Sequence, residues 1–109
     1  MAETIKVVIQ RPGQISEITE IKNSLKSINC IVGGLSTEVT IPGTGLRLIM
    51  NVNACRRNMK PTLKTLWGRI YGTVLIIIRD EDRYINLTPA QIQSAREWLL
   101  RHTYEGAKK

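Results

Sequence analysis

The residues best suited to bind a ligand through charge lie in one short stretch, NVNACRRNMKPTLKTLWGR, at positions 51–69. It carries five bases and no acid, and it lies within a longer acid-free interval between Glu38 and Asp80. The bases of that interval are Arg47, Arg56, Arg57, Lys60, Lys64, Arg69 and Arg79. Outside the interval, bases and acids balance, so the net charge of +7 comes entirely from the middle of the chain.

Clustered bases of this kind are typical of a site for an anion. The Arg guanidinium presents a planar fork of donors that matches phosphate, and neighbouring bases raise the local positive potential. Aromatic side chains in the same region offer flat faces on which a nucleotide base could stack. We therefore predict a ligand-binding surface that comprises Arg47, Arg56, Arg57, Lys60, Lys64, Trp67, Arg69 and Tyr71.

The same residues also admit a purely structural interpretation. The bases could face solvent or pair with the acids at positions 80–82, since charge runs are more often solvated than functional. The rings of Trp67 and Tyr71 could pack in the core, which is the commoner location of such side chains.

Catalytic chemistry has little support. Cys55 lies beside Arg56 and Arg57, which would favour a reactive thiolate, but His102 is the single histidine and is distant in sequence. The glycines match no phosphate loop or dinucleotide motif. Two cysteines and one histidine give no recognisable metal-ligand spacing. We expect a protein that is not an enzyme and that uses no cofactor or metal.

The elements that must position the basic residues are strands and helices in alternation. Apolar and β-branched runs predict strands at 4–10, 14–21, 35–41, 46–52, 69–79 and 84–87. The run at 69–79 is the most apolar and predicts a central strand that is covered on both faces. Within the basic stretch, Leu63, Leu66 and Trp67 have helical spacing, whereas Pro61 and the nearby asparagines favour a loop.

Two helices complete the predicted architecture. One extends from a cap at Ser24 to Gly33 and Gly34, and the other begins at Thr88, where Thr-Pro-x-Gln forms a capping box. The order β-β-α-β-β-β-β-α indicates an α+β fold with a small, mostly antiparallel sheet. At 109 residues we expect a single domain, with a frayed tail from about residue 104.

The cellular setting is predicted from what the sequence lacks. No apolar run approaches the ~20 residues of a membrane span, and the N-terminus has no basic segment before an apolar one. The few cysteines are expected to be reduced thiols. We therefore expect a cytoplasmic protein without a membrane partner.

Several segments in a fixed order resemble a known family. They are IKVVIQRPG, SLKSINCIVGG followed by TEVTI, LRLIMN, RIYGTVLII and INLTPAQIQ, and together they extend from about Ile5 to Leu100. The pattern is similar to that of small proteins from firmicute phages, plasmids and conjugative elements, known as a domain of unknown function. The middle of the chain departs from the family's Pro-Asn-Arg element, because Thr62 follows Pro61 where the family has Asn.

The resemblance implies a setting but transfers no site residue, since none is established for the family. It implies an accessory, anti-defence protein in a bacterial host, and we expect a homo-oligomer that sequesters a nucleotide immune signal, such as a cyclic nucleotide, in a basic surface or inter-subunit pocket. Two alternatives remain open. The basic surface could bind nucleic acid, or it could bind an acidic patch of a host defence protein.

Overall fold

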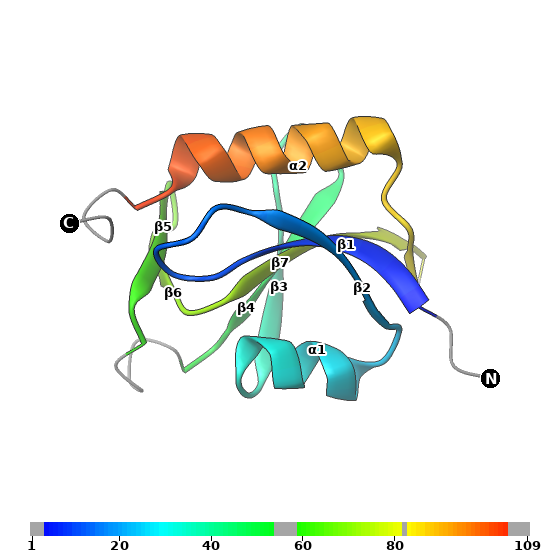
Figure 1. The fold of residues 1–109 in the computed structure, drawn as a ribbon, viewed down its shortest axis with the longest axis horizontal. Coiled ribbons are helices and arrows are strands. Elements are labelled where there is room, and N and C mark those ends of the chain that lie inside the picture. The colour runs from blue at the N-terminus through cyan, green and yellow to red at the C-terminus, as the bar shows by residue number, and fades with distance from the viewer. Residues whose placement is uncertain (1–3, 54–58, 82, 105–109) are drawn as a thin grey trace.

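The computed structural model describes residues 4–53, 59–81 and 83–104. Eight strands and two helices occur in this part of the chain (Figure 1). The strands are β1 (Thr4–Gln10), β2 (Glu17–Lys22), β3 (Ser36–Thr40), β4 (Leu46–Asn51), β5 (Pro61–Thr65), β6 (Gly68–Tyr71), β7 (Val74–Asp80) and β8 (Arg83–Ile85). The helices are α1 (Leu25–Val32) and α2 (Pro89–His102). This arrangement confirms the predicted α+β class, with two helices and a mostly antiparallel sheet.

One antiparallel sheet forms the middle layer of the molecule. Its strands lie in the order β2-β1-β7-β4-β3, and β8 pairs with the end of β7. Strand β7 is central because Ile76 has a partner on each side, Val8 of β1 and Leu48 of β4. Most of the long apolar run therefore occupies the central position that its composition predicts.

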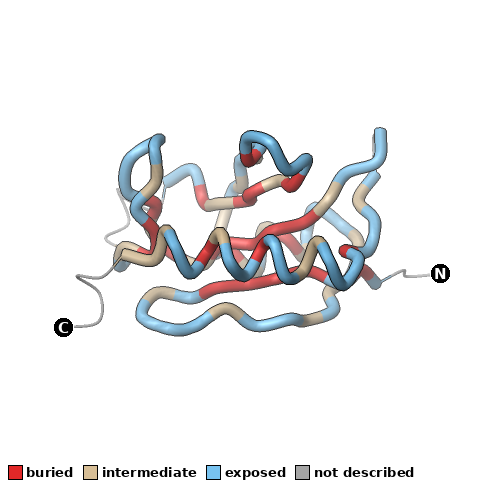
Figure 2. Tube along the Cα trace, turned by 90° about the horizontal axis from the view of Figure 1, so that it is seen from above, coloured by how far each residue is buried: buried red, intermediate tan, exposed pale blue. Residues whose placement is uncertain are grey.

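The two helices cover opposite faces of this sheet, with α2 above it and α1 below it in Figure 1. Because side chains alternate along a strand, β7 contributes to both faces. Val74 and Ile76 belong to the core beneath α2, whereas Leu75 and Ile77 belong to the core against α1. All four are fully buried, and Figure 2 shows the buried residues along the central strands. The prediction that this strand is covered on both faces is confirmed.

Both helices begin where the sequence predicts, and α1 also ends there. Ser24 caps α1, since its Oγ accepts a hydrogen bond from the Ser27 N–H at 3.1 Å, and Gly33 ends it with φ +85°. At α2, the Thr88 Oγ1 accepts from the Gln91 N–H at 3.2 Å, and the Gln91 side chain accepts from the Thr88 N–H at 2.8 Å. Each cap satisfies backbone groups that the first or last turn of a helix leaves without partners.

Between residues 60 and 74 the structure differs from the predicted elements in two respects. The run at 69–79 is two strands, because the chain turns at Gly72, whose φ is +80° and whose N–H donates to the Lys60 carbonyl at 2.9 Å. The helical spacing at 63–67 does not produce a helix. Instead, β5 pairs with β6 as a separate two-stranded hairpin.

Candidate functional site

The β5–β6 hairpin carries the larger part of the predicted binding residues that the structure describes. They are Lys64, Trp67, Arg69 and Tyr71, and Lys60 lies just before β5. The two-residue turn at its tip is fixed by Thr65, whose Oγ1 accepts from the Trp67 N–H at 3.1 Å and donates to the Gly68 carbonyl at 3.2 Å. Gly68 has φ +99°, a conformation that favours glycine. The turn therefore holds Trp67 at the tip of the hairpin.

The hairpin has one apolar face and one basic face. Leu63 and Ile70 are 0% and 5% exposed and belong to the core beneath α2. Their neighbours Lys64 and Arg69 lie directly opposite each other in the strand register and are exposed. Like charges in this relation weaken strand pairing rather than stabilise it. An anion bound between them would relieve that repulsion, because it can accept hydrogen bonds from both.

Contacts with the end of α2 hold the hairpin in place. Leu63 forms an isolated antiparallel bridge with Thr103, and the Tyr104 N–H donates to the Thr62 carbonyl at 2.9 Å. The Thr103 Oγ1 in turn accepts from the Gln10 side chain of β1 at 3.2 Å. Figure 1 shows β5 and β6 at the C-terminal end of α2. The basic face is thus attached to both the core and the helix.

Aromatic rings gather at the same end of the molecule. The guanidinium of Arg69 lies over the Tyr104 ring, 5.2 Å from its centroid. The centroid of the Trp67 ring lies 6.4 Å from that of Trp98, which stacks on His102 at 4.3 Å. The His102 Nδ1 lies 2.8 Å from the Trp98 carbonyl oxygen, which fixes the orientation of the imidazole. Trp67 remains 41% exposed, so one flat ring is available to a ligand.

The cations of the hairpin have no acidic partner within the part of the chain that the structure describes. The ion pairs found there are Arg11–Glu17, Arg47–Glu38 and Arg79–Glu38. Among these residues, Asp80 and Glu81 form no ion pair with the hairpin cations, and Asp82 lies outside the described residues. The other part of the structural alternative, that the bases face solvent, agrees with the exposure of Lys60, Lys64 and Arg69. The acid that pairs with two bases of the interval is Glu38, from its N-terminal boundary.

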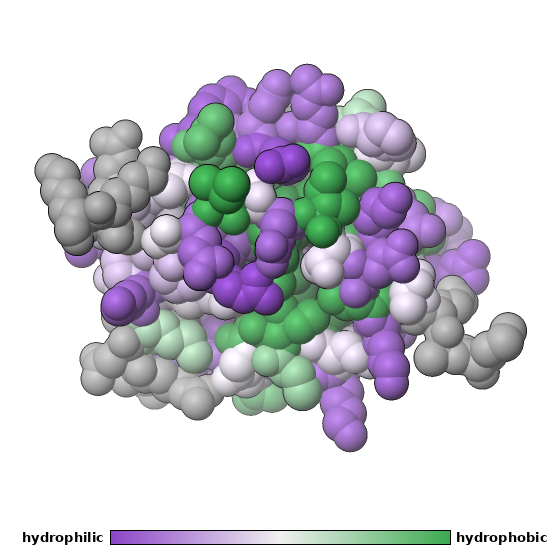
Figure 3. Space-filling view, in the orientation of Figure 1, coloured by the Kyte–Doolittle hydropathy of each residue, from purple (hydrophilic) through white to green (hydrophobic). Residues whose placement is uncertain are grey.

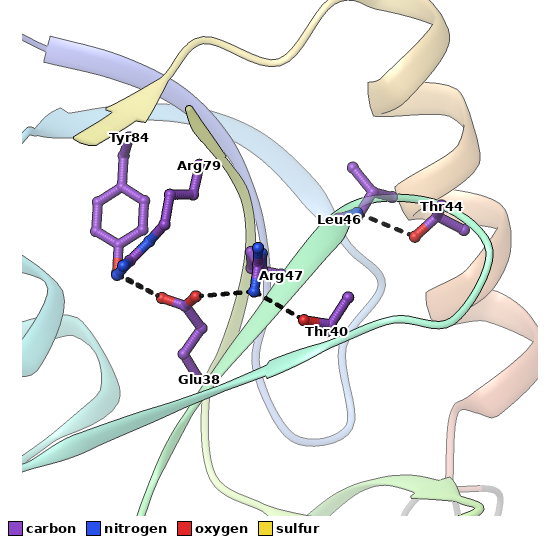
Figure 4. A network of polar contacts seen from close by, with 7 residues as sticks. All are labelled: Glu38, Thr40, Thr44, Leu46, Arg47, Arg79 and Tyr84. Carbon is purple, nitrogen blue, oxygen red and sulfur yellow. Dashed lines mark hydrogen bonds and ion pairs between the residues drawn. The ribbon is translucent and has the colours of Figure 1, made fainter. Parts of the chain in front are cut away.

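Glu38 is the centre of a polar network on the α1 side of the sheet (Figure 4). Its carboxylate lies 3.0 Å from Arg79 Nη2 and 3.5 Å from Arg47 Nη1, and it accepts from the Tyr84 hydroxyl at 2.7 Å. The hydrogen bond with Tyr84 and the charge of Glu38 raise the pKa of Arg79, whose Nη2 donates to the Tyr84 hydroxyl at 3.1 Å. Burial, more than the charges around it, raises the pKa of Tyr84.

The network separates Arg47 from the other predicted site residues. Arg47 pairs with Glu38 and donates to the Thr40 hydroxyl at 2.7 Å, across the β3–β4 register. It alternates along β4 with Leu46 and Leu48, which belong to the core beneath α2 together with the hairpin. Its side chain therefore lies on the opposite face of the sheet, and the structure does not bring it to the hairpin.

The remaining predicted residues have different positions. Arg56 and Arg57, and Cys55 beside them, lie outside the described residues. Lys60 is exposed, and Tyr71 is half-buried at the base of the hairpin, opposite Pro61.

Sequence reasoning missed the contribution of α2 to this surface. Trp98 of this helix stacks on His102 and approaches Trp67. The i, i+4 spacing of Trp98 and His102 was a signal that could have paired them. Tyr104, at the start of the predicted frayed tail, is held by its hydrogen bond to Thr62.

Two classes of site are not found within the described residues. No group of three or more His, Cys, Asp or Glu side chains gathers there in a way that could hold a metal ion. Neither of the helices that they form combines the length and apolar character that crossing a bilayer requires.

The comparison with known proteins identifies a family. Residues 5–100 match the domain of unknown function DUF3846, which accounts for nearly the whole chain and agrees with the extent of the resemblance seen in the sequence. No curated protein and no solved structure matches the chain. The protein with the basic β5–β6 hairpin therefore belongs to the DUF3846 family.

Proposed function

We propose that the protein is a non-catalytic binder of a phosphorylated ligand, a nucleotide, which it holds on the outer face of the β5–β6 hairpin. The observation that supports this most is the pair Lys64 and Arg69, opposite each other and exposed, with no ion pair among the described residues. A phosphate group supplies several acceptor oxygens at once and would receive hydrogen bonds from both cations. Because Tyr104 lies beneath the guanidinium of Arg69, the rim of that group keeps its donors for the ligand.

The aromatic part of the surface suits the base of the same ligand. Trp67 is supported from one side by Trp98 and is partly exposed at the tip of the turn. A base that stacks on such a ring gains roughly 1–3 kcal/mol without any requirement for sequence-specific hydrogen bonds. Nucleotides combine a phosphate with a flat base, so they match the two kinds of group that the hairpin presents.

The proposed setting follows from the family resemblance. We place the protein in the cytoplasm of a bacterial host, as an anti-defence accessory of a phage or other mobile element. There it would sequester a nucleotide immune signal, for which a cyclic nucleotide is the leading candidate, and it would act by holding the signal rather than by cleaving it. A homo-oligomer would increase the number of sites in each particle.

Single-stranded nucleic acid is the second candidate ligand. The specific observation in its favour is the row of rings formed by Trp67, Trp98 and His102, since successive bases stack on such rows in single-strand binding proteins. Binding of this kind weakens steeply with salt because each neutralised phosphate releases a counterion. Binding of a single small nucleotide depends less steeply on salt, because fewer phosphates take part.

Isothermal titration with cyclic dinucleotides, cyclic trinucleotides, cyclic ADP-ribose isomers and a short single-stranded oligonucleotide tests the proposal. We expect the Lys64→Ala/Arg69→Ala double variant to bind at least about tenfold more weakly, since two charge-assisted hydrogen bonds are lost. The matched control is Lys22→Ala/Lys26→Ala, which removes two exposed cations from β2 and α1. Equal losses in both variants, or no binding by the native protein, would count against the hairpin as the site. A steep salt dependence confined to the oligonucleotide would favour the second candidate.

A further inference from the structure

A groove lies between α2 and the turn that joins β1 to β2, separate from the basic hairpin. Its volume is about 640 Å³, and its walls include Ile15, Ser16, Ile92, Arg96, Glu97 and Leu100. Ile15 is 82% exposed and Leu100 is 71% exposed, although both are large and apolar. Figure 3 shows apolar side chains that interrupt the polar surface between α2 and the β1–β2 hairpin. Apolar residues gathered at a groove indicate a surface that another molecule covers.

Two opposite charges at consecutive positions near the middle of α2, Arg96 and Glu97, belong to the wall of this groove. The Nε and Nη2 of Arg96 donate to the Oγ and the carbonyl of Ser16 at 3.3 and 3.4 Å, which hold the guanidinium against the β1–β2 turn. Glu97 is exposed. Neither Arg96 nor Glu97 forms an ion pair with any residue in the described ranges. A partner whose surface carries charge of only one sign would thus attract one of these residues and repel the other.

We propose that this groove is an interface between two copies of the chain, with α2 of each subunit packed antiparallel across a twofold axis. When an axis passes between residues 96 and 97, Arg96 faces Glu97 of the partner subunit, and Glu97 faces Arg96 of the partner subunit. A twofold interface is self-complementary in this way, because every contact occurs twice. The same operation brings Leu100 beside Gln93 of the partner subunit and removes apolar surface from water. A second copy of the helix, in antiparallel orientation, therefore presents the two charges in the opposite order, so that unlike charges meet.

Charge reversal in solution tests the interface by sedimentation equilibrium of the full chain. We expect Arg96→Glu and Glu97→Arg each to weaken dimerisation by about tenfold or more, since both symmetry-related pairs become repulsive. The double variant Arg96→Glu/Glu97→Arg keeps the native net charge and restores both pairs, so it should dimerise like the native protein. Lys26→Glu, on α1, is the control for a change in net charge and should leave the equilibrium unchanged.

Several results would overturn the proposal. They are a native chain that is monomeric up to millimolar concentration, single variants that dimerise as well as the native chain, or a double variant that stays as weak as the single ones. Circular dichroism verifies the fold of each variant. If Arg96→Glu disturbs the β1–β2 turn through its contact with Ser16, Glu97→Arg still decides the question, because the Glu97 side chain is exposed and forms no ion pair within the described residues.

Discussion

Truncation of Leu63 to Ala tests whether the β5–β6 hairpin belongs to the same cooperative unit as the central sheet. Leu63 is 0% exposed and lies in the core beneath α2. A two-stranded hairpin is marginally stable alone, so its position depends on this burial. The backbone bonds of the hairpin to Thr103 and Tyr104 oppose collapse of the cavity that truncation leaves. We therefore expect a loss in the upper part of the usual range, about 3–5 kcal/mol in the free energy of unfolding.

Urea unfolding, followed by circular dichroism and by tryptophan fluorescence, measures this loss. Fluorescence reports on the contact between Trp67 of the hairpin and Trp98 of α2, whereas circular dichroism reports on the whole fold. Leu66→Ala is the matched control, since Leu66 belongs to the same hairpin but is 77% exposed and should cost less than about 0.5 kcal/mol. A loss below about 1 kcal/mol for Leu63→Ala, or fluorescence that changes well before circular dichroism, would refute the assignment of the hairpin to the common core.

Two further predictions concern the α1 side of the sheet. Because the pKa of Tyr84 is raised in the folded state, its hydroxyl stabilises the protein fully below about pH 10, and this contribution is lost as pH rises through the folded pKa. The fall in melting temperature between pH 9 and about pH 11 should therefore be smaller in Tyr84→Phe than in the native protein. Equal falls in the two proteins would contradict this linkage between Tyr84 and stability. Gly33→Ala should lower stability by more than about 1 kcal/mol, because φ is +85° and the added Cβ would lie 3.2 Å from the Met59 Cε. The control is Gly43→Ala, in which the added Cβ meets no atom within 4 Å at a similar φ. Comparison of the two variants by thermal melting separates the steric contribution to the loss of stability from the contribution of backbone strain.

The fold was predictable where local signals and tertiary packing agree. The caps at Ser24 and Thr88 and the glycine at the end of α1 determine helix boundaries by themselves, because their hydrogen bonds are local. The apolar run of β7 predicted a strand covered on both faces, since only a central position in a sheet buries so many consecutive apolar residues.

The hairpin was not predictable in the same way. The spacing of Leu63, Leu66 and Trp67 matches a helix, but only Leu63 is buried, and the other two residues form an exposed turn that Gly68 permits. Burial of a single residue is too weak a pattern to distinguish a short strand from a helix.

The candidate site was predictable in composition but not in arrangement. The charge count identified Lys64 and Arg69, and the register places them opposite each other. The charge count also included Arg47, because distance along the sequence does not reveal the face of the sheet on which a side chain lies. The partner that neutralises Arg47 is Glu38, nine positions earlier on a neighbouring strand, and only strand pairing brings these two together.

The burial of β7 on both faces has a consequence for how the sheet finds its alignment. A strand that is polar on one face is aligned by that difference, but residues 74–77 are apolar in every position. A shift of β7 by one residue would still present Val, Leu or Ile to both cores. The same shift would move Arg79 away from Glu38 and Tyr84 and turn it toward the core beneath α2, where its charge would be costly. The polar network at the end of β7 therefore favours a single register for the most apolar strand of the sheet.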